Sequence, residues 1–138
     1  MDKRGLEQII RDEGMRLKPY RCTEGKLTIG VGRNLEDTGI TKEEARYLLH
    51  NDYDLARDTA TLYPCWTSLN GPRQAVLVNM VFQMGAAGVS KFRKMFSALD
   101  KKDYDLAATE MLDSRWHRQT PKRALRLALQ MRTGKWID

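Results

Sequence analysis

Glu13 stands at a position where a helical pattern calls for an apolar side chain. Leu6, Ile9 and Ile10 are spaced along one face of a helix, and Glu13 takes the next place on that face. An acid there should be partly desolvated, which raises its pKa and lets it keep a proton near neutral pH as a general acid. The alternative is a structural acid at a helix end that pairs with Arg16.

The residues that follow predict a β-hairpin or small sheet with an open face. Residues 17–32 break the helical period and alternate, with a turn expected at residues 23–26. Thr28 shares its face with Gly30 and Gly32, so a ligand can approach this strand closely; the alternative is that the glycines only permit sheet twist or close packing. An acid at a helix end and a hydroxyl on an open strand are together suited to the hydrolysis of a polymer.

Helices are predicted on both sides of this hairpin. The first should end near Gly14, which is a plausible C-terminal cap. Thr41 and Glu44 have the spacing of a capping box, and apolar residues recur at helical spacing up to about Leu62. At roughly 1.5 Å per residue this second helix is about 33 Å long, which is enough to bridge two lobes.

The second half of the chain reads as a set of helices. Pro72 suits a first helical position, and the AVLVNMVFQM segment that follows is apolar on nearly every side, which predicts a buried central helix. Further helices are expected at residues 104–112 and after Pro121.

We therefore expect a single domain, residues 1–138, of the α+β class and mostly helical. Its two lobes should have a cleft between them. The expected lobes are a small sheet-bearing lobe with the linking helix, at about residues 13–60, and a helical lobe made of about residues 1–12 and 61–138.

The overall charge points to an anionic partner. The chain carries a formal charge of +6, which suits nucleic acid, acidic lipid or bacterial cell wall alike. Its basic residues are spread out, with a modest concentration from Arg115 to Arg132 and no aromatic-interleaved basic motif, so we expect no nucleic-acid partner. No segment is long and apolar enough to predict stable membrane insertion, and the start, MDKRGLEQII, does not resemble a signal peptide.

The cysteines and histidines give no sign of a disulfide or a metal site. Cys22 and Cys65 lie far apart in a cysteine-poor chain, which favours free thiols in a reducing compartment. His50 and His117 form no ligand cluster with them, so no metal is expected.

The spacing of Glu13, Cys22 and Thr28 resembles the motif of the phage-type lysozymes, glycoside hydrolase family 24. That motif is Glu, eight residues, Asp or Cys, five residues, Thr. The resemblance to the T-even members of the family extends over almost the whole chain, although this chain is shorter, mostly between Arg33 and Ile40. It rests on the segments DEGMRLKPY, TEGKLTIGVG, ITKEEA, NMVFQMG, SRWHRQTPKRA and RTGKW, in that order.

The resemblance implies hydrolysis of the β-1,4 bond between N-acetylmuramic acid and N-acetylglucosamine in peptidoglycan. Glu13 would protonate the leaving oxygen, and Thr28 would help to hold a water that attacks with inversion. No cofactor is implied, and we expect a monomer. Cys22 replaces the aspartate of the T-even pattern, so it would act as a thiolate, a polarisable neighbour or a nucleophile, or would only fill space at a turn. Glu24 is a candidate for the missing negative charge.

Other positions carry over from the family by matching place. Arg33 replaces a histidine, and we expect it to pair with Asp52. Gln83 would donate hydrogen bonds to an acetamido group, and Arg123 would pair with the catalytic acid and favour its ionised form. Core packing is the alternative for Phe82, Met84 and Trp116. The residues expected to contact the glycan are Glu24, Phe82, Gln83, Arg115, Trp116, Gln119, Thr120 and Arg123.

These features together predict an endolysin of phage or prophage origin. It would accumulate in the host bacterial cytoplasm and reach the periplasm or cell wall through a separate permeabilising protein. One alternative is a glycan-binding or scaffolding module that keeps the fold without the activity. Another is a lytic transglycosylase, which needs the acid but not the water and ends in an anhydro sugar.

Overall fold

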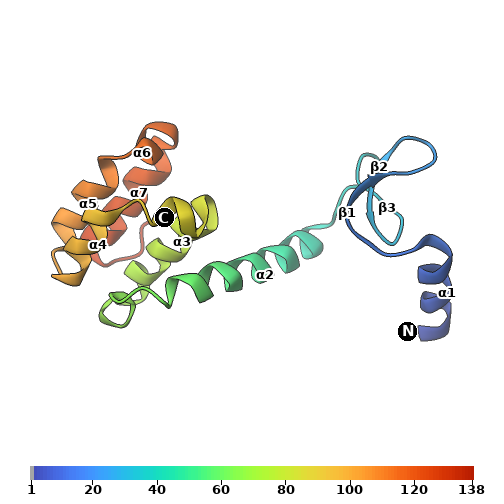
Figure 1. Ribbon diagram of the computed structural model, residues 1–138, viewed down its shortest axis with the longest axis horizontal. Coiled ribbons are helices and arrows are strands. Elements are labelled where there is room, and N and C mark those ends of the chain that lie inside the picture. The colour runs from blue at the N-terminus through green and yellow to red at the C-terminus, as the bar shows by residue number, and fades with distance from the viewer. Residues whose placement is uncertain (1) are drawn as a thin grey trace. The chain divides into compact units, whose positions relative to one another are not determined.

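The computed structural model describes residues 2–138, which divide between Leu48 and Leu49 into two compact units. We call them the N-terminal unit and the helical unit (Figure 1). Helix α2 (Lys42–Ala60) begins in the first and ends in the second. Most of the described residues are helical and one small antiparallel sheet lies near the N-terminus, so the predicted α+β class is confirmed.

The N-terminal unit starts with helix α1 (Lys3–Glu13), which is capped at both ends. The Asp2 carboxylate accepts a hydrogen bond from the Gly5 N–H at 3.1 Å, and the Gly14 N–H donates to the Ile10 carbonyl at 2.7 Å. The predicted end of the helix at Gly14 is confirmed.

A three-stranded antiparallel sheet follows α1, in the order β1-β2-β3, so the predicted hairpin or small sheet is confirmed. The turn between the first two strands is closed by two backbone hydrogen bonds. The Cys22 N–H donates to the Lys26 carbonyl at 3.0 Å, and the Gly25 N–H donates to the Cys22 carbonyl at 2.8 Å. The strands are β1 (Arg16–Arg21), β2 (Leu27–Gly30) and β3 (Arg33–Asn34).

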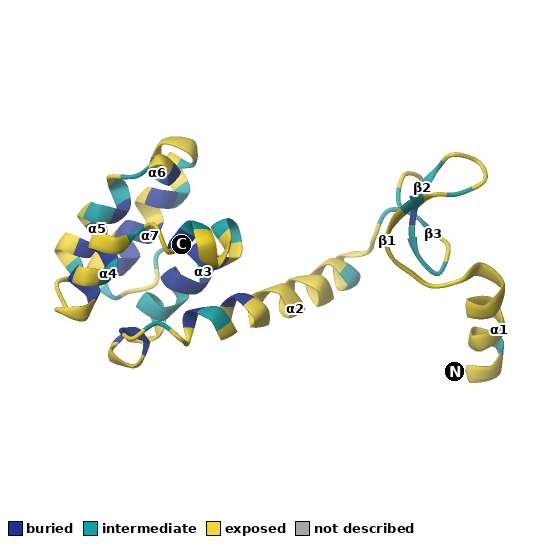
Figure 2. Ribbon diagram, in the orientation of Figure 1, coloured by how far each residue is buried: buried dark blue, intermediate teal, exposed yellow. Residues whose placement is uncertain are grey.

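The apolar stripe of α1 finds no cover within the N-terminal unit. None of the helix is buried, and Ile9, the most exposed residue of the stripe, keeps 54% of its surface accessible (Figure 2). The sheet is too small to offer a face for this helix. The expectation that residues 1–12 belong to the helical lobe therefore stays a prediction, as does the cleft between the lobes.

The helical unit has a core built around α3, as the sequence predicts. Val76, Leu77 and Met80 of α3 are fully buried, and the buried residues of the other helices pack around them (Figure 2). Asn70 caps the start of α3 by accepting a hydrogen bond from the Arg73 N–H at 3.1 Å. The helices are α3 (Gly71–Val89), α4 (Arg93–Asp100), α5 (Tyr104–Leu112), α6 (Arg115–Gln119) and α7 (Pro121–Thr133), after a short 3₁₀ turn, η1 (Trp66–Ser68).

A kink at Gly85 interrupts α3, which the apolar pattern did not predict. Its φ of 74° and ψ of 169° lie outside the helical region and are readily adopted only by glycine. The kink places Phe82, Gln83 and Met84 at the end of the regular part of the helix.

The start of α2 forms the predicted capping box. The Thr41 N–H donates to Glu44 Oε1 at 2.9 Å, and the Glu44 N–H donates to Thr41 Oγ1 at 3.1 Å. Arg33 Nη1 also donates to Glu44 Oε1 at 2.8 Å, so Glu44 is its partner within the N-terminal unit. The expected pair with Asp52, which belongs to the helical unit, stays a prediction.

These contacts hold the pKa of Glu44 far below its usual range, at about 2. The Arg33 guanidinium is the main cause, followed by the Thr41 N–H. A folded-state pKa below the unfolded value of about 4.3 stabilises the fold at higher pH, and this contribution is lost as the pH falls toward the folded-state pKa.

Glu44→Gln is expected to lower the midpoint of thermal unfolding by about 1–3 °C near neutral pH, because the neutral amide attracts Arg33 less strongly. The gap to the native chain should narrow as the pH falls from about 5, where Glu44 of the unfolded chain begins to bind a proton, toward about 2, where the folded carboxylate is also protonated. Glu43→Gln is the matched control, since it removes the same charge from the same helical turn. Equal midpoints for the two variants near neutral pH would contradict this role of Glu44.

Candidate functional site

The Glu13 carboxylate lies against Gly32, just after strand β2. A Cβ atom at Gly32 would stand only 3.2 Å from Glu13 Oε2, and the φ of Gly32 is +70°. Gly32 therefore makes room for the acid itself. From the sequence we expected a ligand in that space. The approach of α1 to the end of β2 is a tertiary contact, which the spacing of residues along the chain does not reveal.

Glu13 is exposed within the N-terminal unit, so that unit does not supply the expected desolvation. The alternative, an ion pair with Arg16, is also wrong: among residues 2–138 the ion pairs of arginine do not include this one, and the Arg16 guanidinium lies over the Tyr20 ring at 4.5 Å. Within the N-terminal unit the Glu13 carboxylate therefore lies beside Gly32 and is exposed.

Thr28 lies on the central strand and is only 3% exposed, so the expected open face is wrong at this residue. Its backbone pairs with Tyr20 on β1 and with Asn34 on β3, which encloses it from both sides. The Thr28 hydroxyl donates to the Lys26 carbonyl at 2.9 Å. Because its proton is used there, the oxygen is left with lone pairs that can accept a hydrogen bond from water.

Cys22 is a half-buried free thiol at the start of the turn. The backbone N–H groups of Glu24 and Lys26 lower the pKa of Cys22, while burial and the Glu24 carboxylate act in the opposite direction. The turn therefore favours the thiolate. It also brings Cys22, Thr28 and Glu24 together, as the sequence expected.

Cys65 has the opposite environment. It is 3% exposed in the core of the helical unit, where burial raises the pKa of its thiol to about 11. The expectation of two free thiols is confirmed, and only Cys22 has surroundings that activate a thiolate.

Gln83 is the centre of a hydrogen-bond network in the helical unit. The Trp116 indole N–H donates to Gln83 Oε1 at 2.8 Å, and Gln83 Nε2 faces Thr120 Oγ1 at 3.5 Å. Trp116 is 5% exposed and packs edge-on against Phe92 with ring centroids 5.9 Å apart. Core packing, one of the two roles expected of Trp116, is therefore confirmed. Trp116 contacts Gln83 from the core side.

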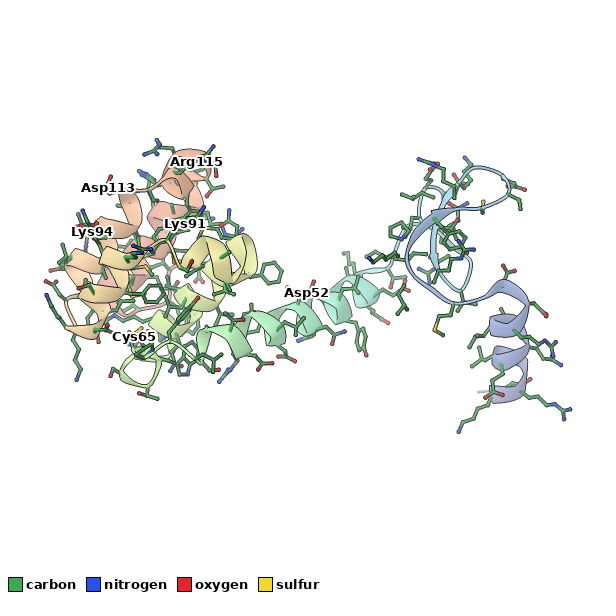
Figure 3. The ribbon with its side chains drawn as sticks, viewed as in Figure 1. Asp52, Cys65, Lys91, Lys94, Asp113 and Arg115 are labelled. Carbon is green, nitrogen blue, oxygen red and sulfur yellow. The ribbon has the colours of Figure 1, made fainter. Side chains whose placement is uncertain are left out.

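A pocket of about 540 Å³ opens beside this network. It contains the expected contact residues Arg115 and Gln119, and Trp116 forms part of its wall. Five charged residues of the pocket were not predicted, because the segment around the start of α4 and the end of α5 carry no motif that relates them; they are Lys91, Arg93, Lys94, Glu110 and Asp113. Figure 3 labels Lys91, Lys94 and Asp113.

The remaining expected residues of the helical unit fall into two groups. Phe82 is 43% exposed and so lies outside the buried core, whereas Met84 packs against that core. Arg123 donates from Nε and Nη2 to Asn79 Oδ1 at 3.0 and 2.6 Å, a contact that the sequence did not predict. The pairing of Arg123 with Glu13 stays a prediction.

Two further classes of site are absent from the described part of the chain. Residues 2–138 contain no group of three or more His, Cys, Asp or Glu side chains placed to hold a metal ion. No single helix among them has both the length and the apolar character needed to cross a membrane.

Comparison with known proteins shows to which family the chain belongs. The family model described as phage lysozyme matches residues 11–133. The pre-baseplate central spike protein Gp5 of Enterobacteria phage T4 is 38% identical over 157 residues, covering 93% of this chain but only 27% of the spike protein.

Shorter relatives match along most of their own length. The probable T4-type lysozyme 2 of Dictyostelium discoideum is 32% identical over 153 residues, covering 89% of this chain and 90% of the relative. The endolysin of Acyrthosiphon pisum secondary endosymbiont phage 1 is 31% identical over 120 residues, covering 81% and 77%. The chain therefore belongs to the phage lysozyme family of glycoside hydrolases.

Proposed function

We propose that this chain is a muramidase that hydrolyses the β-1,4 bond between N-acetylmuramic acid and N-acetylglucosamine in bacterial peptidoglycan. The observation that carries the proposal is the arrangement of the N-terminal unit, in which Glu13 lies against Gly32 and a thiolate-favouring turn holds Cys22 beside Thr28. Membership of the phage lysozyme family supports the substrate class. The charge of +6 supports an anionic polymer as the partner.

In this proposal Glu13 is the general acid. It protonates the glycosidic oxygen as the C–O bond breaks and positive charge develops on the sugar ring. An exposed carboxyl group becomes desolvated when the glycan covers it, which favours the protonated form needed for this step. The proton thus moves from Glu13 to the leaving sugar.

A water molecule attacks the anomeric carbon from the opposite face and inverts its configuration. Thr28 accepts a hydrogen bond from this water, because the Thr28 proton is already donated to Lys26. The Cys22 thiolate takes the proton that the water loses, and the negative charge of Glu24 stabilises the cationic sugar ring. Since Glu13 gives one proton and Cys22 gains one, the enzyme recovers its starting state by exchange with solvent.

The biological role we propose is that of a phage or prophage endolysin, which acts on the cell wall after release from the host cytoplasm. The named endolysins among the relatives support this role. The 38% identity to a spike protein favours a second candidate, a lysozyme unit that belongs to the virus particle. Mass spectrometry of purified particles separates the two, because only a particle component would be found there.

Glu13→Gln is expected to reduce the clearing of a peptidoglycan suspension by about 100-fold or more, because the amide cannot donate the required proton. Asp12→Asn is the matched control: it removes the neighbouring exposed carboxylate, which contacts Arg11, and should leave clearing near the native rate. Equal clearing by the native chain and Glu13→Gln, or no clearing by the native chain, would rule out this role. A native chain that binds but does not clear would be a glycan-binding module.

The reaction products identify the step that follows acid catalysis. Hydrolysis by water leaves reducing muramic ends, whereas a transglycosylase leaves anhydro ends, and mass spectrometry of the digested glycan distinguishes them. We expect reducing ends, with one ¹⁸O atom incorporated at each when the reaction is run in H₂¹⁸O. Anhydro ends would remove the need for Thr28 and for the attacking water.

Cys22→Asp is expected to preserve or raise kcat/KM, and Cys22→Ala to lower it about tenfold or more, because alanine supplies no base. The two variants should also differ from the native chain in pH dependence. The native thiolate forms only as the pH rises through a pKa that lies below the ordinary thiol value, whereas aspartate is ionised above about pH 5.

The ratio of native to Cys22→Asp kcat/KM should therefore increase between about pH 5 and pH 8. Cys65→Ala serves as the control, since that thiol is buried and its removal should not change the shape of the profile. Full activity in Cys22→Ala, or parallel profiles for the native and aspartate enzymes, would show that the thiol has no chemical role.

A further inference from the structure

Glu36, in the loop between β3 and α2, is joined to the turn at residues 22–26 and to the start of β2. Its Oε1 atom accepts hydrogen bonds from the Leu27 N–H at 3.0 Å and from Arg21 Nη1 at 3.0 Å. The same Arg21 nitrogen donates to the Gly25 carbonyl at 2.9 Å. A carboxylate oxygen can accept two hydrogen bonds and Nη1 carries two N–H groups, so these contacts form one continuous chain from Gly25 to Leu27.

This chain of contacts orients two consecutive peptide groups. A peptide group is planar, and in the usual trans form its C=O and N–H point in opposite directions. The Gly25 carbonyl and the Lys26 N–H belong to one group, and the Lys26 carbonyl and the Leu27 N–H belong to the next. Because Arg21 and Glu36 hold the Gly25 carbonyl and the Leu27 N–H, both backbone groups of Lys26 are turned to the opposite side.

The two backbone groups of Lys26 are the ones that serve the proposed site. The Lys26 carbonyl accepts the Cys22 N–H at 3.0 Å and the Thr28 hydroxyl at 2.9 Å. The Glu24 N–H and then the Lys26 N–H are the donors that lower the pKa of the Cys22 thiol. The direction of these groups therefore decides both the state of the thiol and the direction of the hydroxyl.

The attraction between Arg21 and Glu36 is not the main purpose of the pair. The two side chains are 66% and 40% exposed, and an exposed ion pair adds little stability. The Leu27 N–H, rather than the arginine, is the largest cause of the lowered pKa of Glu36. The carboxylate therefore stays ionised near neutral pH and serves mainly as an acceptor for the backbone.

We propose that Glu36 is a positioning residue of the proposed reaction, because it holds the two peptide groups whose other ends face Cys22 and Thr28. The inference rests on the proposed function in taking Cys22 and Thr28 as the groups that act on the attacking water. Glu36 lies between Arg33 and Ile40, where this chain is shorter than its T-even relatives, so no role carries over to it by matching position.

The ionisation of the Cys22 thiol reports whether the turn is held in this way. The Glu24 carboxylate is the charged group that acts on the thiol directly, and it disfavours the thiolate. Removing the negative charge of Glu36 would favour the thiolate through space, whereas a loosened turn would point its N–H donors away and disfavour it. The two effects have opposite signs. Arg21 is less suitable for the test, because the loss of its positive charge also disfavours the thiolate.

The measurement is the rate at which iodoacetamide alkylates Cys22 as a function of pH. A Cys65→Ala parent leaves one thiol in the chain, and because only the thiolate reacts, the midpoint of the profile reports its ionisation. In Glu36→Ala we expect the midpoint to rise. Below the midpoint of the parent, the rate relative to the plateau at high pH should fall about threefold to tenfold, the range for the loss of one oriented hydrogen bond.

Two further variants separate the reach of Glu36 from its charge. Glu36→Gln removes the charge but keeps an oxygen that can accept the Leu27 N–H, so its midpoint should lie close to that of the parent. Glu36→Asp keeps the charge but is one methylene group shorter, so it cannot reach Arg21 and Leu27 together. Its midpoint should rise as in Glu36→Ala.

The controls remove a carboxylate from the same unit without touching these two peptide groups. Asp37→Ala takes away the neighbouring negative charge, which pairs with the side chain of Lys26 at 3.4 Å. Glu44→Gln weakens the contacts at the start of α2, so it reports the effect of lower overall stability. Neither control should raise the midpoint.

Three results would overturn the inference: an unchanged or lower midpoint in Glu36→Ala, a midpoint in Glu36→Asp equal to that of the parent, or an equal rise in Glu44→Gln. Clearing of peptidoglycan is assayed separately, and in Glu36→Ala its pH profile should move upward with the thiol. A native chain that does not clear, with the order of the midpoints intact, would count against the proposed hydrolysis and support the positioning role, so the two failures are distinguishable.

Discussion

The carbonyl oxygen of Lys26 is the acceptor on which the arrangement of the N-terminal unit depends. It receives the Cys22 N–H at 3.0 Å, which closes the turn, and the Thr28 hydroxyl at 2.9 Å, which fixes the direction of that hydroxyl. One backbone group therefore positions both the thiol and the hydroxyl. Because the turn is closed by backbone contacts, its geometry does not depend on which side chain stands at position 22.

The helical unit uses the same principle with side chains. A group that can only donate or only accept a hydrogen bond decides the orientation of a group that can do both. The indole N–H of Trp116 does so for the Gln83 carboxamide, and the Lys26 carbonyl does so for the Thr28 hydroxyl. In both places the group left free for a ligand is determined by a contact on the protein side, in the core or in the turn. Such orientation before binding reduces the entropy lost when the ligand arrives.

The features that depend on residues close together in the chain were predicted correctly from the sequence. The capping box at Thr41 and Glu44, the end of α1 at Gly14 and the turn at residues 23–26 each depend on residues a few positions apart, and all were confirmed. The predictions that failed depend on contacts between distant segments. Gly32 accommodates Glu13, and Thr28 is enclosed by two strands, facts that alternation within one strand cannot show.

The partner of Arg33 within the N-terminal unit was also not predicted. The family pattern placed its charge opposite Asp52, whereas in this unit Arg33 meets Glu44 at the start of α2. Glu44 also gains from Arg33 because the capping box has already restricted its rotamer, so less side-chain entropy is lost in the pair.

The turn also gives a physical reason why the motif that this sequence resembles accepts either an aspartate or a cysteine at the position of Cys22. The backbone N–H groups of Glu24 and Lys26 that lower the pKa of Cys22 are donors, and a carboxylate at this position would accept from the same groups. They stabilise an anion whatever its chemical type. The cost of cysteine lies in its higher intrinsic pKa, so its anion forms at higher pH than that of an aspartate.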